Sequence, residues 1–101
     1  MQFWQGGITM NPEEYIQLGL NGDAPLKVIM CGKIGDIENS KIGVVSVVYA
    51  TMDKQLAEEK FKKLSTTDRS SYYMVYSVPL DVDLTTLDHY PSIAITKEDL
   101  I

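Results

Sequence analysis

The side chains best suited to chemistry gather near the C-terminus. Asp81, Asp83, Asp88 and His89 fall within nine residues, and two acids that are two positions apart point to one side of an extended segment. Carboxylate oxygens and an imidazole are ligands that divalent cations accept. The spacing matches no known metal motif, however, and acids that alternate along a solvated strand give the same pattern. We therefore predict no metal site. If a metal ion did bind to this segment, Asp81, Asp83 and His89 would be its ligands.

His89 is the only histidine, and its imidazole is expected to exchange protons near neutral pH without a large pKa shift. Beside Asp88 it would act as a general base in a small enzyme. A histidine in a loop is more often solvated or capping, so the sequence assigns no catalytic role beyond these two candidates. It predicts no cofactor either, because the glycines around Lys33 lack the Gly-Lys-Ser/Thr ending of a phosphate-binding loop.

Cys31 is the only cysteine, so no internal disulfide can form. It ends the apolar run Val28–Cys31, and a thiol in such a run is expected to be buried and unreactive. A chain without disulfides suits a reducing compartment. The first residues also lack the basic start and the apolar core of a signal peptide. We therefore predict a cytoplasmic protein.

Tyrosines supply the main candidate surface. Tyr72, Tyr73 and Tyr76 lie in one strand-like run and Tyr49 in another, and tyrosine is common at interfaces because it tolerates both wet and dry surroundings. Pairing between strands of one molecule is the alternative. Lys60 lies on the apolar face of a predicted helix, where it either reaches an anionic ligand or extends its methylenes along the core edge. These five residues are the predicted ligand or partner surface.

Composition excludes two classes of partner. The 101 residues carry a formal net charge of −5, with 45% hydrophobic and 23% charged residues, which is ordinary for one soluble domain. A net negative chain is not expected to bind nucleic acid or anionic membranes. No apolar run approaches the ~20 residues that span a bilayer. A second copy of the chain, or another protein, is the predicted partner.

Five segments have clear secondary-structure patterns. Continuous or alternating apolar residues predict strands, and apolar residues that recur on one helical face predict helices. The predicted elements are, in order, a helix over Met10–Gly22, a strand over Leu26–Ile34, a loop over Gly35–Lys41, a strand over Ile42–Ala50, a helix over Thr51–Leu64 and a strand over Ser71–Val78.

This order predicts an α+β fold, a two-layer sandwich of a mostly antiparallel sheet with two helices on one face. If residues 1–9 add an edge strand, the order becomes (β)αββαβ, which favours a ferredoxin-like arrangement. If they are a loose terminus, the fold is an αββαβ sandwich of another kind. Ser92–Thr96 is a candidate for one extra C-terminal strand. The sequence contains no sign of a second domain.

No motif carries a chemistry of its own, so the function hypotheses rest on surfaces. The first is a small binding or interaction module that acts through its tyrosine-rich sheet face as a homodimer. The second is a small enzyme of dimeric α+β-barrel type that uses His89 and the nearby acids. The third is a regulatory domain that senses a small metabolite between protomers.

Overall fold

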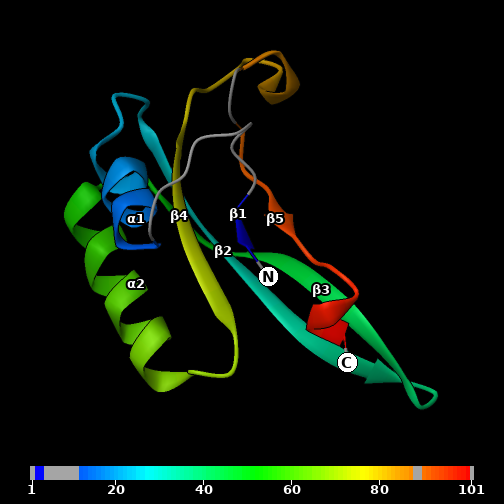
Figure 1. Cartoon of the computed structure of the whole chain (residues 1–101). Coiled ribbons are helices and arrows are strands. Elements are labelled where there is room, and N and C mark those ends of the chain that lie inside the picture. Colours follow the sequence, from blue (N-terminus) through cyan, green and yellow to red (C-terminus); the bar gives the residue numbers. More distant parts are fainter. Residues whose placement is uncertain (1, 4–11, 88–89, 101) are drawn as a thin grey trace.

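The computed structural model describes residues 2–3, 12–87 and 90–100. It is an α+β structure in which a three-stranded sheet carries two helices (Figure 1). The elements are β1 (Gln2–Phe3), α1 (Pro12–Asn21), β2 (Leu26–Ile37), β3 (Ser40–Thr51), α2 (Lys54–Thr67), β4 (Tyr72–Val78), the 3-10 turn η1 (Leu84–Thr86), β5 (Ile93–Ala94) and the 3-10 turn η2 (Glu98–Leu100).

The sheet is antiparallel throughout, with strand order β3-β2-β4. β2 and β3 form a long hairpin, closed by a two-residue turn at Glu38 and Asn39. Both turn residues have positive φ, 49° and 67°, which is the requirement of the type I′ turns that suit the twist of a hairpin. The predicted loop over Gly35–Lys41 is therefore wrong, because this tight turn lets both strands continue almost to their tips.

Both helices cover the same face of the sheet, as predicted (Figure 1). The core on this side joins one residue from each element that meets there: Leu20 of α1, Ile29 of β2, Ala57 of α2 and Val75 of β4. Ile29, Ala57 and Val75 have no exposed surface. Small and branched side chains at these positions let the helices approach the strands closely, so burial holds both layers together.

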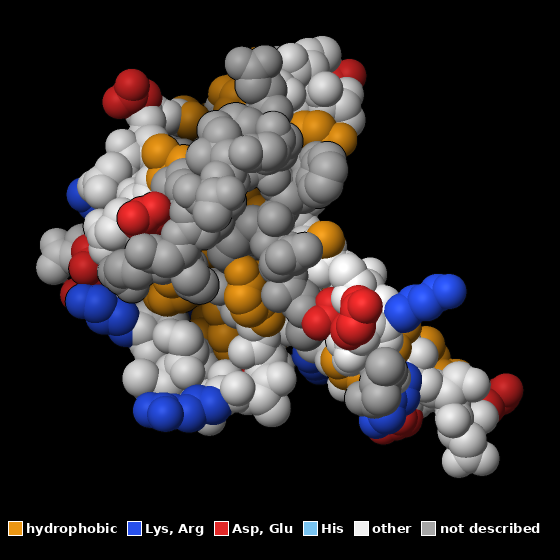
Figure 2. Space-filling model, viewed as in Figure 1, with side chains coloured by type: hydrophobic (Ala, Val, Ile, Leu, Met, Phe, Trp, Pro, Cys, Tyr) orange, Lys and Arg blue, Asp and Glu red, His pale blue; other side chains and the backbone are white. Residues whose placement is uncertain are grey.

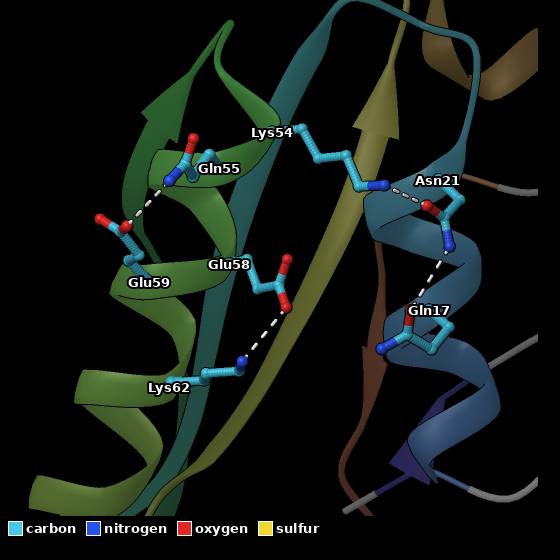
Figure 3. A network of polar contacts seen from close by, with 7 residues as sticks. All are labelled: Gln17, Asn21, Lys54, Gln55, Glu58, Glu59 and Lys62. Carbon is cyan, nitrogen blue, oxygen red and sulfur yellow. Dashed lines mark hydrogen bonds and ion pairs between the residues drawn. The ribbon is translucent and has the colours of Figure 1, made fainter.

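A chain of polar contacts joins the two helices at one end (Figure 3). The Lys54 ammonium, in the first turn of α2, donates to the side-chain oxygen of Asn21, the last residue of α1. The Asn21 amide donates in turn to Gln17, at 3.4 Å. Asp53 is the N-cap of α2, where its carboxylate accepts from the backbone N–H groups of Gln55 and Leu56.

The opposite face of the sheet is covered by the C-terminal part of the chain, which we call the tail (residues 90–100). Val28, Met30 and Val78 form a second buried cluster, and Ile93 of the tail packs against it. The tail then reaches β3, where the Ile95 side chain lies directly over Gly43. The sequence offers Ser92–Thr96 as a candidate strand, but it does not indicate which face the tail would cover, because that depends on contacts with strands far away in the sequence.

The predicted ferredoxin-like arrangement does not match this sheet. In that arrangement the first strand would join the main sheet, but β1 pairs with β5 in a separate two-stranded ribbon. The candidate strand near the C-terminus belongs to this ribbon and adds nothing to the main sheet. β4 pairs with β2 instead, so the buried central strand has a hydrogen-bonded neighbour along each of its two edges.

Gly19 marks the closest approach of α1 to the sheet. A Cβ atom at this position would overlap the carbonyl oxygen of Val75 and lie 2.7 Å from its carbonyl carbon. We expect Gly19→Ala to lower the free energy of unfolding by about 1–3 kcal/mol, even though alanine favours a helix, because the backbone of β4 has to move. Chemical denaturation measures the change.

The matched control is Leu18→Ala, on the same helix at a side chain that is 53% exposed. We expect this variant to stay close to the wild-type stability. Equal stabilities for the two variants would show that α1 does not contact β4 in this way.

Candidate functional site

The predicted acidic cluster does not form an extended ligand set. Residues 80–87 bend and then enter η1, so Asp81 and Asp83 do not alternate along a strand. Asp83 caps η1, accepting from the backbone N–H of Thr85 at 3.0 Å and from its hydroxyl at 2.7 Å. These hydrogen bonds lower the pKa of Asp83. Asp81 is exposed and has a φ of 57°.

Asp88 and His89 lie outside the described residues. Within the part of the chain that the structure describes, no three His, Cys, Asp or Glu side chains come together in a way that would hold a metal ion. The described residues therefore add no support to the enzyme hypothesis.

The four predicted surface tyrosines do not share a face. Side chains alternate along β4, so Tyr73 points to the helices with Tyr49 of β3, and both pack against the core there. Tyr76 packs against the other cluster, under the tail. Its hydroxyl donates to the Ser92 carbonyl oxygen at 2.6 Å, which fastens the tail to the sheet. Tyr72, four positions before Tyr76 on the same strand, lies on the same side of the sheet. A single exposed row of rings is thus absent from these strands.

Lys60 reaches from α2 towards β3. Its ammonium nitrogen lies 5.7 Å from the centre of the Tyr49 ring, within the range of a cation–π interaction. The side chain is half-buried, so its methylenes run along the core edge. This contact helps to hold α2 over β3.

Tyr73 and Asp68 form a second pair, at the end of α2. The Tyr73 hydroxyl donates to the Asp68 carboxylate at 3.0 Å, and Ser70 donates to the other carboxylate oxygen at 2.7 Å. The Ser70 hydroxyl contributes most to lowering the pKa of Asp68 to about 2. Burial, followed by the hydrogen bond to Asp68, raises the pKa of Tyr73 to about 12. Both groups hold their ordinary charge states at neutral pH, so the pair is structural.

Cys31 is buried, as the sequence predicted. It lies on the helix side of β2, opposite Tyr73 of β4. A thiol without access to solvent does not meet the conditions for a reactive cysteine.

Lys27 is a buried charge that the sequence did not reveal, since a lysine at the start of a strand is usually solvated. It is 6% exposed, and its ammonium donates to the Gly22 carbonyl at 2.8 Å, the Ala24 carbonyl at 3.1 Å and the Ser77 hydroxyl at 2.7 Å. The Ser77 hydroxyl donates onward to the Gly19 carbonyl. The cation therefore satisfies carbonyls just after the C-terminus of α1, where positive charge is favoured.

The free edge of β3 is the largest feature that the sequence analysis missed. In the described part of the chain β3 pairs only with β2, and no charged residue occurs between Lys41 and Asp53. Val45 and Val47 are 43% and 63% exposed. The uncharged, β-branched run was visible in the sequence, but nothing in it indicated that β3 would be the outer strand.

The hairpin also extends beyond the rest of the sheet. β4 pairs with β2 only over Leu26–Gly32, so residues 33–44, which we call the arm, have no third strand. The arm projects from the body of the protein (Figures 1 and 2). Ile37, next to its turn, is 56% exposed. Ile37 is the one apolar side chain of the segment Asp36–Lys41, whose other residues are charged or polar.

Comparison with known proteins gives no relative: no protein family, curated protein or solved structure matches this chain. None of the helices in the described residues has the length and apolar character that crossing a membrane requires. The functional argument therefore rests on the geometry of the described residues.

Lys27→Met tests the buried cation. Methionine fills the same space but leaves the Gly22 and Ala24 carbonyls without their donor, so we expect the free energy of unfolding to fall by about 1–3 kcal/mol. Lys33→Met, on an exposed position of the same strand, serves as the control. Thermal and chemical unfolding measure both. A Lys27→Met protein as stable as the Lys33→Met protein would contradict this role.

Gly43→Ala tests the seat of the tail. A Cβ at Gly43 would lie 2.9 Å from the Ile95 Cγ2 atom, whereas a Cβ at Gly35 would meet its neighbours at an ordinary 3.7 Å. We expect Gly43→Ala to increase hydrogen exchange and protease cleavage in the tail, because Ile95 has to move. Gly35→Ala should leave the tail as protected as in the wild type. Unchanged protection in both variants would refute the contact.

Proposed function

We propose that this protein is a small interaction module that works as a homodimer, with two copies joined along the free edges of β3. One observation carries the proposal: β3 is an outer strand of twelve residues, and its middle carries exposed valines and no charge. A reducing, cytoplasmic setting is part of the proposal, because the single cysteine is buried and needs no partner.

An edge of this kind is unusual for a protein that acts alone. Soluble proteins protect outer strands with charged side chains, prolines or short length, since free backbone N–H and C=O groups attract other strands. β3 has none of these protections between Lys41 and Asp53. A partner strand would satisfy the free backbone groups and cover Val45 and Val47.

The other outer strand is protected. β4 has seven residues and is followed directly by Pro79, which cannot donate to a ladder. α1 packs against it, with Gly19 touching the backbone of Val75. The two edges of the sheet are therefore not equivalent, and only β3 is suited to pair with another chain.

A second copy fits this edge because the strand is complementary to itself. When two identical strands pair antiparallel, a two-fold axis relates them and the same residues are buried on both sides. The uncharged middle of β3 brings no like charges together, although the whole chain carries a net charge of −5. The pairing would join two three-stranded sheets into one of six strands.

Val47→Lys tests the proposal. Sedimentation equilibrium over a range of concentrations is expected to give a dimer for the wild type and a monomer for Val47→Lys, because a charged side chain in the middle of each β3 edge would interrupt the apolar surface that the partner strand covers. Thr67→Lys adds the same charge at an exposed position at the end of α2, and should remain a dimer.

Circular dichroism of the three proteins checks that each is folded. A wild-type protein that stays monomeric at all concentrations would overturn the proposal. So would a Val47→Lys protein that is folded and dimeric.

A further inference from the structure

The hairpin turn determines which backbone groups of β3 are free. Ile37 and Ser40 flank the two-residue turn, and the pair that closes such a turn is hydrogen-bonded. Because hydrogen-bonded and non-hydrogen-bonded pairs alternate in an antiparallel ladder, the alternate residues of β3 direct their N–H and C=O groups away from β2. These are Lys41, Gly43, Val45 and Val47.

A bulge ends this regular stretch. Val47 is opposite Met30 and Tyr49 is opposite Ile29, so Val48 is an extra residue without a partner on β2. The bulge reverses the alternation, since Tyr49 packs on the helix side whereas Val47, opposite Met30, lies on the tail side. A partner strand can therefore form a regular ladder only with residues 41–47.

We infer that the two copies of β3 pair antiparallel about a two-fold axis at Val44. This inference rests on the proposed homodimer and specifies its register. It is the symmetric register in which all four outward-facing residues form hydrogen-bonded pairs: Lys41 with the partner's Val47, and Gly43 with the partner's Val45. Registers centred on Val45 or Ser46 use fewer of these residues, because they push one strand past the bulge of the other.

The exposed side chains fit this register. Val47, which is 63% exposed, would lie beside the aliphatic stem of the partner's Lys41. Val45 would lie beside the partner's Gly43, where the absence of a side chain leaves it room to touch the partner's Ile95. Both valines are on the tail side of the sheet, so one arrangement covers both.

The ends of the strand match as well. The register places the arm tip of one copy alongside the residues that follow the bulge in the other. Ile37 at the tip is 56% exposed, while Met52 and Leu56 beyond the bulge are 59% and 46% exposed. Because the axis is perpendicular to the sheet, the helix sides of both copies face the same way. The partner's Ile37, which lies on the helix side of β2, would then approach Met52 and Leu56 near the start of α2.

Single cysteines locate the axis. At Val44 the two copies meet in a non-hydrogen-bonded pair, with Cα atoms about 4.5 Å apart, which permits a disulfide. Two cysteines at position 45 would be about 9 Å apart and two at position 46 about 14 Å apart, both too far to bridge. The wild type, whose one cysteine is buried, is the blank.

We expect most Val44→Cys protein to become a covalent dimer under mild oxidation, while Val45→Cys and Ser46→Cys remain largely uncrosslinked on non-reducing gels. Sedimentation of the reduced proteins shows separately whether each variant is a dimer. Preferential crosslinking of Val45→Cys or Ser46→Cys would overturn the register and leave the β3 homodimer standing. A Val44→Cys protein that is dimeric when reduced but does not crosslink would also overturn it. Monomeric reduced proteins would remove the homodimer itself.

Discussion

The structure depends on β2 being buried on both of its faces and paired along both of its edges. Lys27 to Gly32 form an unbroken buried stretch, with Ile29 facing the helices and Val28 and Met30 facing the tail. Apolar burial of this kind is the largest favourable term in folding. Every other element can be described by how it covers this strand: β3 and β4 satisfy its backbone, and the helices and tail cover its side chains.

The same constraint explains which parts of the hairpin are left uncovered. Cover is concentrated around the first half of β2, because β4 ends its pairing there. Beyond Gly32 the hairpin has no third strand, so the arm and the outer edge of β3 carry the apolar surface that the monomer does not bury. Val47 is opposite Met30, beside the covered half of β2, and it is exposed because no described strand pairs with the outer edge of β3.

Local patterns predicted the elements well, because helix and strand periodicities reflect which side faces a core. The antiparallel sheet, the two helices on one face and the buried Cys31 all followed from such patterns. What depends on distant neighbours was not predictable. Nothing near Lys27 in sequence indicates that Ser77 and the end of α1 would surround its ammonium. The choice of β2 as the central strand, which rules out the ferredoxin-like order, likewise depends on competition between whole strands.

The candidate site shows the same division between what local patterns predict and what depends on distant contacts. The prediction grouped Tyr73 and Tyr76 on one surface, whereas alternation along β4 places them on opposite sides of the sheet, and the sequence did not show that the tail would cover one side. Exposure of β3 also has two possible consequences that only symmetry separates. If the β3 edge of one molecule pairs with a different edge of the next molecule, the product is an open fibre. If it pairs with the β3 edge of a second copy about a two-fold axis, the free β3 edges of both molecules are used and growth stops. Protection of β4 by Pro79 and α1, and interruption of β3 by the bulge at Val48, both act against the fibre. In the proposed homodimer, a strand that is exposed, uncharged and limited in this way pairs with one partner strand and no more.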